Sequence, residues 1–326
     1  MIEILSSTAL ATVQDAGRLG SLRFGVGTAG AMDQLALAVG NLLLGNPTGA
    51  AALEVPVYPF QVRFTEDCAF ALTGADCQAR LDQQALAPWW VNQARKGQVL
   101  TLGLPMPGSG SRAYLALAGG IDVPEVLASR STQLRGAFGG LDGRAVRQGD
   151  VLRAAKPGVV PEVDFGVMPP TLALPLTCDG LPAMRVLPAA EYTGFKEDSR
   201  AAFWAGEWKI TAQSDRYGYR MQGTPLVPIA AMEIRSHGIV PGVIQVPSSG
   251  QPIVQMRDAQ PSGGYPKFGT VIEADLWRLG QAAIGSRVRF VEATYESAIA
   301  ALDEVQAWLD EVQRLIELQR WALQRK

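Results

Sequence analysis

Histidine and cysteine are both scarce in this sequence, and their scarcity excludes several kinds of chemistry. His237 is the one histidine among 326 residues. Zinc sites rich in histidine are therefore excluded, and His237 is the single candidate base for a serine or cysteine nucleophile. The three cysteines, Cys68, Cys77 and Cys178, form no C-x-x-C pair. We expect buried thiols in a reducing compartment, and neither a disulfide scaffold nor a thiolate metal site.

Positive charge and aromatic side chains are also in short supply. Lysine and arginine total 29 against 31 aspartates and glutamates, and aromatic residues make up 7%. A chain of this kind has no excess of cations to follow a phosphate backbone and few rings on which bases could stack, so nucleic-acid binding is disfavoured. No apolar run approaches the roughly 18 residues of a membrane span, and the first residues lack a basic-then-apolar signal pattern. We expect a cytoplasmic protein that does not contact membranes.

The chain is long enough for two domains, and its apolar residues occur in short runs separated by turns. Its 35 glycines and 21 prolines are spread through most of the sequence. Runs such as 60–64 and 287–291 alternate apolar and polar residues, which is typical of half-buried strands. Short strands with frequent turns predict a mainly β fold built from barrels or sandwiches.

Two segments have the periodicity of helices. The first is 32–44, where apolar residues share one face and Gly45-Asn46-Pro47 supplies a stop signal. The second is a long tail helix from about Tyr295 to Gln324, with a near-heptad apolar stripe between charged residues. Such a stripe needs a covering surface, which could come from this chain or from another protein chain.

A proline-rich stretch divides the sequence, because proline lacks the donor that central strands need. We predict an N-terminal β-rich domain over 1–155, a linker over 156–182, a C-terminal β-barrel domain over 183–293 and a terminal helix over 294–326.

The segment Gly25-Val26-Gly27-Thr28-Ala29-Gly30 fits G-x-G-x-x-G and precedes a predicted helix. A dinucleotide fingerprint also needs a buried parallel strand before its first glycine. The preceding residues 20–24 are too short and too polar for that strand, so a Rossmann unit is not expected. The sequence also has no phosphate-binding G-x-x-x-x-G-K-[ST] motif and no G-x-S-x-G nucleophile elbow.

Polar residues gather with glycine in four places, namely 14–20 with 30–33, 129–132 with 139–144, 214–220, and 255–260 with 263–266. Glycine lets a backbone approach a ligand, arginine supplies a forked donor for carboxylate or phosphate, and aspartate can hold a metal or accept a proton. Taken singly, each cluster is also compatible with a turn that contains a structural Asp–Arg contact, and His237 with a turn or core histidine. Because four clusters occur in one chain of low charge, we predict that they fold together into one pocket for a charged small molecule.

At these same clusters the chain resembles the family of allophanate hydrolase subunit 2 and the C-type subunit of 5-oxoprolinase. The resemblance covers residues 3–292 and is carried by the segments 14–18, 30–33, 41–46, 119–121, 129–132, 140–144, 214–220, 244–247 and 260–266. It implies two β-barrel-like domains, with a cyclophilin-like barrel in the C-terminal half. That fold agrees with the strand-and-turn pattern of the residues.

The resemblance also implies an activity and companions. The family includes one component of ATP-dependent 5-oxoprolinase, which acts with a B-type subunit, while the full reaction also needs an A-type subunit. ATP and Mg²⁺ would then be the cofactors. Two alternatives remain open: a carboxyltransferase component of a biotin-dependent urea-type carboxylase, with biotin carried by a partner, and a non-catalytic regulator that binds a B-type kinase-inhibitor protein.

Site residues follow from the four clusters and the chemistry of lactam phosphorylation, which needs anion-binding donors, a metal and proton transfer. For catalysis we predict Asp15, Asp142 and Asp258, and for magnesium Asp33. For substrate or nucleotide binding we predict Arg18, Arg130, Ser131, Thr132, Arg144, Asp215, Arg216, Arg220, Gln245, Gln260 and Tyr265. Gln245 and Gln260 are the residues expected to read a lactam amide.

Overall fold

The computed structural model describes residues 1–7, 10–155, 165–232 and 234–323. It divides into two compact units that interleave along the chain. Unit 1 comprises Met1–Arg18, Ala29–Ala173 and Ala307–Lys326, and unit 2 comprises Leu19–Thr28 and Leu174–Gln306. The domains predicted from sequence are contiguous ranges, and part of the predicted linker, 156–164, lies outside the described residues.

Unit 1 contains two antiparallel sheets. The larger sheet has the order β11-β12-β1-β4-β9-β6-β7 and the smaller sheet has the order β2-β3-β10-β5-β8. The strands of the larger sheet are β1 (Ile2–Ser6), β4 (Phe60–Phe64), β6 (Arg80–Leu81), β7 (Gln84–Ala85), β9 (Val99–Leu102), β11 (Ile121–Asp122) and β12 (Val151–Ala154). Those of the smaller sheet are β2 (Thr12–Gln14), β3 (Ala52–Val55), β5 (Cys68–Gly74), β8 (Trp90–Ala94) and β10 (Ala113–Leu117).

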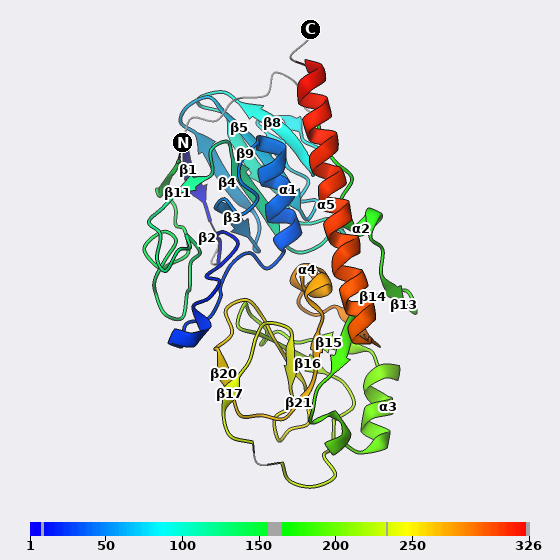
Figure 1. The fold of residues 1–326 in the computed structure, drawn as a ribbon. Helices are drawn as coiled ribbons and strands as arrows, with labels where there is room; N and C mark the ends of the chain where they lie inside the picture. Colours follow the sequence, from blue (N-terminus) through cyan, green and yellow to red (C-terminus); the bar gives the residue numbers. More distant parts are fainter. Residues whose placement is uncertain (8–9, 156–164, 233, 324–326) are drawn as a thin grey trace. The chain divides into compact units, whose positions relative to one another are not determined.

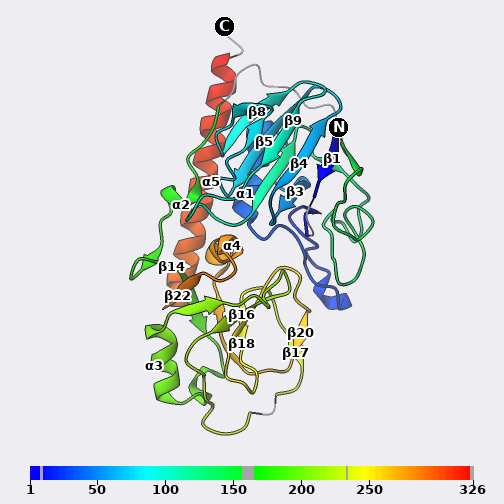
Figure 2. The ribbon, with the colours of Figure 1, turned by 180° about the vertical axis from the view of Figure 1, so that it is seen from behind.

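A continuous apolar core lies between these two sheets. Alternate residues of β4, such as Val62 and Phe64, join Phe70 of β5 and Leu115 of β10 in one buried cluster. The opposite face of the smaller sheet is lined by small residues such as Ala71 and is covered by helices. Figures 1 and 2, drawn from opposite sides, show α1 and α5 on one face of this sheet.

Helix α1 (Gln34–Leu44) matches the helix predicted over 32–44 within two residues. Its N-cap is Asp33, whose carboxylate accepts a hydrogen bond from the amide of Ala36 at 2.9 Å. It ends where Gly45 adopts a left-handed conformation with φ 75°. The start and the stop therefore follow from local chemistry that the sequence displays.

Eight of the remaining described strands belong to a barrel in unit 2. The sheet order is β13-β14-β21-β18-β19-β16-β15-β22, and an additional parallel pairing between β14 and β22 closes it. These strands are β13 (Thr177–Cys178), β14 (Leu181–Pro188), β15 (Trp208–Ile210), β16 (Gly218–Gln222), β18 (Val243–Gln245), β19 (Ile253–Gln255), β21 (Lys267–Val271) and β22 (Arg287–Glu292). A separate two-stranded antiparallel sheet pairs β17 (His237–Gly238) with β20 (Ser262–Gly263).

The barrel interior is aromatic. Phe203, Phe268 and Phe290 are buried together, and the rings of Phe203 and Phe290 stack with their centroids 5.0 Å apart. Three further short helices are α2 (Pro170–Ala173) in unit 1 and α3 (Glu197–Ala205) and α4 (Leu276–Gln281) in unit 2. Unit 2 also contains the 3-10 turns η1 (Leu22–Phe24), η2 (Tyr192–Gly194) and η3 (Glu273–Asp275). The predicted mainly β fold is confirmed.

The predicted terminal helix is also confirmed, as α5 (Tyr295–Leu323). Part of its apolar stripe is covered by this chain, whereas Ile299 and Leu302 are 41% and 38% exposed. Val312 and Ile316 join the cluster that contains α1, and Ala298 and Ala301 join a cluster of unit 2. Arg320 donates to the carbonyl oxygens of Leu42 and Leu43 at the end of α1, a position that favours a cation.

Candidate functional site

Asp15 connects two of the loops that the sequence singled out. Its carboxylate accepts hydrogen bonds from the amide of Gly17 at 2.8 Å, the hydroxyl of Ser129 at 2.7 Å, the hydroxyl of Ser131 and the amide of Arg130. Asp15 lies directly after β2, while Ser129–Ser131 are more than a hundred residues away along the chain. One buried carboxylate thus fixes the path of a loop from a distant part of the sequence.

Arg18 reinforces the same junction from within. Its side chain is fully buried, its Nε donates to the carbonyl of Val126 at 3.1 Å and its Nη2 donates to the carbonyl of Ser131. Its guanidinium also lies 4.7 Å from the centre of the Phe138 ring. Because its donors face backbone carbonyls and a ring, Arg18 orders the loop, although the sequence predicted ligand binding.

The glycines of 139–143 are required by close packing against this loop. A Cβ at Gly140, where φ is +54°, would lie 1.9 Å from Oγ1 of Thr132, and a Cβ at Gly139 would lie 2.2 Å from the carbonyl oxygen of Ser131. The Thr132 hydroxyl itself donates to the carbonyl of Val13 at 3.0 Å. The two glycine-containing clusters of unit 1 therefore meet, as predicted, and their glycines serve the meeting of backbone with backbone.

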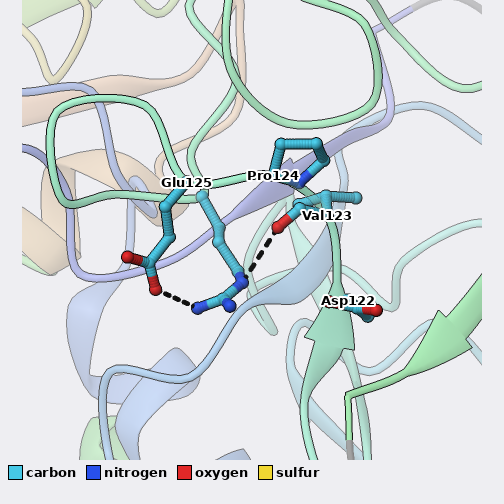
Figure 3. Close-up of a pocket in the computed structure, with 5 residues that line it drawn as sticks. Asp122, Val123, Pro124 and Glu125 are labelled. Atoms are coloured by element: carbon cyan, nitrogen blue, oxygen red, sulfur yellow. Dashed lines mark hydrogen bonds and ion pairs between the residues drawn. The ribbon is translucent and has the colours of Figure 1, made fainter.

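A hollow of about 430 Å³ opens beside this junction, lined by Asp122, Val123, Pro124, Glu125 and Arg130 (Figure 3). Arg130 donates from Nε to the carbonyl of Val123 at 3.0 Å and from Nη1 to the Glu125 carboxylate. Its side chain is 34% exposed. Arg130 is therefore anchored by two of its nitrogens at the wall of an open hollow, and this arrangement suits a donor to an anion.

Arg144 and Asp142 have other surroundings. The Arg144 guanidinium donates to both carboxylate oxygens of Asp150, at 2.6 and 2.9 Å, and lies 3.7 Å from the Asp142 carboxylate. These hydrogen bonds hold the pKa of Asp150 below its ordinary value. The Asp142 side chain is 78% exposed. The positive charge of Arg144 is therefore already matched by carboxylates of its own loop.

Asp33, the predicted magnesium ligand, caps α1 and lies beside a buried polar network. Its backbone amide donates to the Tyr114 hydroxyl, which in turn donates to the Glu54 carboxylate, both at 2.8 Å. Glu54 is fully buried and also accepts from the Met32 amide. Burial raises the pKa of Tyr114 well above its ordinary value, and the charges of Glu54 and Asp33 add to the effect. Sequence reasoning assigned Glu54 to no site, because a single acid two residues before Pro56 carries no sign of this network.

In unit 2, Arg216 and Asp258 form a buried bidentate ion pair. The guanidinium donates to the two carboxylate oxygens at 3.0 and 2.8 Å, and the side chains are 8% and 6% exposed. The Asp258 amide also donates to the Arg216 carbonyl at 2.9 Å. Next to this pair the Tyr217 hydroxyl donates to Oε1 of Gln260. The third and fourth clusters of the sequence therefore meet each other, as the first two do.

Two further predicted residues, Asp215 and Arg220, lie at or beside β16, and a third, Tyr265, lies between β20 and β21. Asp215 accepts from the amides of Tyr217 at 2.8 Å and Gly218 at 3.2 Å and so shapes the turn that enters the strand. Arg220 is exposed, and Tyr265 is 51% exposed. Asp215 thus has a turn-forming contact, and the other two are surface residues.

Gln245 is 2% exposed and accepts a hydrogen bond from Nε2 of Gln255 at 3.1 Å. The sequence paired Gln245 with Gln260 as the readers of an amide, but the structure pairs it with Gln255. Sequence reasoning missed Gln255, because the strand register that places it two residues beyond Ile253, the cross-strand partner of Gln245, is visible only in the structure.

Predicted site residues occur in two loop junctions, one described within each unit, and their meeting in a single pocket stays a prediction. The junction of unit 1 holds the predicted residues Asp15, Arg18, Arg130, Ser131 and Thr132. Arg216, Asp258 and Gln260 belong to the junction of unit 2.

No group of three or more histidine, cysteine, aspartate or glutamate side chains that could hold a metal occurs among the described residues. Within those residues, no helix is both long and apolar enough to cross a membrane.

Two glycines of the G-x-G-x-x-G segment are required by local packing or backbone conformation. A Cβ at Gly27 would lie 2.5 Å from the carbonyl oxygen of Ala259, and Gly30 has φ +93° beside Gly17.

Comparison with known proteins assigns the chain to a family. The carboxyltransferase domain family, subdomain A and B, matches residues 24–292. The chain belongs to this family. The C-type subunit of 5-oxoprolinase from Escherichia coli (strain K12) is 42% identical over 312 residues, which cover 96% of this chain and 97% of that protein. The protein of the same name from Haemophilus influenzae is 39% identical and covers 97% of this chain and 99% of its own.

A solved structure gives the same fold. The crystal structure of the Kluyveromyces lactis urea carboxylase superposes with a TM-score of 0.86 at 28% sequence identity, over 95% of this chain and 29% of that one. The carboxyltransferase fold therefore occurs both as a chain of this size and as one part of a much larger enzyme.

Proposed function

We propose that this chain is the C-type subunit of an ATP-dependent 5-oxoprolinase, which opens the lactam of 5-oxo-L-proline to L-glutamate. The observation that carries the proposal is the similarity to the E. coli 5-oxoprolinase component, which extends over 96% of this chain and 97% of that protein. Because the similarity extends over nearly all of this chain and of the E. coli protein, the aligned region includes the residues of both loop junctions.

The proposed reaction needs activation of a poor electrophile. Transfer of the terminal phosphoryl group of ATP to the lactam oxygen forms an O–P bond, breaks the terminal anhydride bond and leaves ADP. Water then adds to the activated carbon and the ring C–N bond breaks, so that the freed amine takes up a proton and the side-chain carbonyl is left as an acyl phosphate. A second water cleaves this acyl phosphate, and phosphate and glutamate are released. Charge on the transferred group requires fixed positive donors.

Arg130 is the arginine of the predicted set that fits this role best. Arg144 and Arg216 each hold a carboxylate with two hydrogen bonds, so their charges are compensated. Arg130 has one ionic partner, Glu125, and lies at an open hollow. We assign Arg130 to anion binding, and Arg18 and Arg216 to positioning the loops. Asp15, Asp142 and Asp258 are kept as candidates for proton transfer.

ATP and Mg²⁺ are the cofactors that the proposed reaction requires. A protein-only magnesium cage does not fit the described residues, since they hold no group of three or more metal-binding side chains. Asp33 in particular is 1% exposed and its carboxylate accepts from the α1 backbone. Magnesium bound to nucleotide needs only one or two protein carboxylates, because phosphates and water supply the rest.

The proposal includes companions and a compartment. The site is completed by a B-type subunit, the reaction is completed by an A-type subunit, and the assembly works in the cytoplasm. Reconstitution tests this directly: the three purified proteins are mixed with 5-oxoproline, ATP and Mg²⁺, and glutamate is measured. Glutamate formation that depends on this chain supports the proposal. A complete complex that forms no glutamate refutes it.

Variants of this chain then test the residue assignment. Arg130→Ala should lower the rate by about ten- to a hundredfold, because one charge-assisted hydrogen bond is lost. Arg95→Ala, an exposed arginine of unit 1 remote in sequence from the loops, is the matched control and should retain the rate. An unchanged rate for Arg130→Ala would refute its assignment and leave the function itself standing.

A second function is favoured by the likeness to the K. lactis urea carboxylase, with its TM-score of 0.86. In that case the chain would transfer a carboxyl group from biotin carried by a partner. Bicarbonate-dependent carboxylation of urea with a biotinylated partner, and no glutamate from 5-oxoproline, would establish this second function. Tight binding of a B-type partner with neither reaction would indicate a regulator instead.

A further inference from the structure

Two glutamine amides form a buried pair on the outer face of the unit 2 barrel. Gln245 on β18 is directly opposite Ile253 on β19, and Gln255 is two residues further along β19 on the same face. The alternating residues Ile244 and Val254 are fully buried in the barrel interior. Gln245 and Gln255 therefore point outward, and yet they are only 2% and 4% exposed.

The two-stranded sheet of β17 and β20 supplies the cover. A Cβ built at Gly263 of β20 would lie 2.4 Å from Nε2 of Gln245, so the backbone of β20 lies directly over this amide. His237 of β17 is the cross-strand partner of Gly263. Each strand of this sheet is only two residues long. So short a two-stranded sheet has little stability of its own and can open while the barrel stays folded.

The covered pair has unused hydrogen-bonding capacity. Within the described residues, Nε2 of Gln245 and Oε1 of Gln255 are both buried without a hydrogen-bond partner. The one bond between the amides runs from Gln255 Nε2 to Gln245 Oε1. Turning both amides over would exchange their roles and still leave one donor and one acceptor. Buried polar groups are satisfied in nearly all proteins, so such a pair calls for an explanation.

A cation lies beside the pair. Lys267 on β21 is the other cross-strand neighbour of Gln245, and its side chain is 20% exposed. Directly opposed residues bring their Cβ atoms to about 5 Å. The ammonium group lies 3.8 Å from the Glu191 carboxylate, a distance longer than a charge-assisted hydrogen bond. The outer face thus presents an amide donor, an amide acceptor and an ammonium group.

We propose that Gln245, Gln255 and Lys267 form the recognition site for a lactam that carries a carboxylate, and that the two-stranded β17–β20 sheet covers it. A lactam holds its C=O and N–H on the same side of one bond, so it can accept from one amide and donate to the other. Its carboxylate would pair with Lys267. The site deepens the proposed function and rests on it, since 5-oxoproline has these three groups.

His237 provides a direct reporter, because it is the one histidine of the chain. Its Nδ1 is 2.9 Å from the Arg235 carbonyl oxygen, so Nδ1 carries the proton, and the buried Nε2 has no partner in the described structure. Titration of the full chain labelled with ¹⁵N-histidine, alone and in the reconstituted complex, should shift the imidazole signals when 5-oxoproline or 2-pyrrolidinone is added. N-methyl-2-pyrrolidinone, which lacks the N–H donor, should bind about tenfold more weakly.

Variants separate the two halves of the site. Lys267→Met should weaken 5-oxoproline about tenfold and leave 2-pyrrolidinone unchanged, whereas Gln255→Leu should weaken both. Lys209→Met and Gln222→Leu, exposed positions on β15 and β16, are the matched controls. Gln255→Asn is used in the same titration if the leucine variant does not fold. Thermal unfolding of Gln255→Leu should show only a small loss of stability, because removal of the unsatisfied Oε1 of Gln255 offsets the loss of the hydrogen bond to Oε1 of Gln245.

The outcomes distinguish this site from the proposed function. Imidazole shifts without glutamate formation would support the site and refute the function. Glutamate formation with unshifted imidazole signals would refute the site alone. Equal affinity for the N-methylated lactam, or equal loss of both ligands in Lys267→Met, would also overturn the proposed recognition.

Discussion

Removal of either partner of the Arg216–Asp258 ion pair should destabilise unit 2 strongly. The two hydrogen bonds of 3.0 and 2.8 Å join side chains that are 8% and 6% exposed. Hydrogen bonds to charged groups contribute about 1.5–3 kcal/mol each, and one buried charge left without its partner costs about 3–5 kcal/mol. We therefore expect Arg216→Met and Asp258→Leu each to lower the free energy of unfolding by about 3–5 kcal/mol.

The double variant should lose much less than the sum of the two single variants. With both charges gone, two apolar side chains fill the space and no charge is left buried, so a loss below about 2 kcal/mol is expected. Hydrogen exchange in peptides that cover β16 and β19 measures this locally, which matters because the chain has two units. Additive losses in the double variant would refute the reasoning, since they would mean that the two groups do not stabilise each other.

Three further predictions concern unit 1. Gly140→Ala should lower the free energy of unfolding in urea by about 2–4 kcal/mol, because its Cβ would lie 1.9 Å from the Thr132 hydroxyl. Gly149→Ala has open space around it and should lower the free energy of unfolding by only about 1 kcal/mol. Equal losses in the two variants would contradict the packing argument. Asp33→Ala removes the N-cap of α1 and should cost about 0.5–2 kcal/mol, with Asp33→Asn retaining most of that stability. Hydrogen bonds from Arg144 hold the pKa of Asp150 below its ordinary value of 3.8. The stability that the ionised Asp150 carboxylate contributes to the folded protein is therefore complete at neutral pH, and it is lost as the pH falls through the folded-state pKa. The stability difference between the protein and Asp150→Asn should therefore shrink below about pH 4, and a difference independent of pH would contradict this cause.

Local patterns in the sequence were sufficient for the fold class and for the helices. The strands β4 and β22 follow from period-two alternation, and α1 follows from an apolar face between a capping aspartate and a stop glycine. The length of α5 follows from its stripe. Each of these features depends on residues a few positions apart, so the sequence displays it directly.

The partners of the site residues could not be predicted in this way. Asp15 and Ser131 are separated by more than a hundred residues, and their contact depends on where the strands before each loop pair. Whether an arginine faces solvent or a carboxylate is likewise decided by packing, which gave Arg216 a buried partner and left Arg130 at an open hollow.

The sequence by itself determined the mainly β class, the two principal helices, the family and the loops that carry polar residues, because periodicity, capping and motifs are local. The tertiary structure alone decided that these loops meet in two junctions, that α5 packs on its own chain, and that Gln245 pairs with Gln255 beneath the two-stranded β17–β20 sheet. Those features come from strand register and closure of the barrel, which join residues that are distant in the sequence and leave no local mark on it.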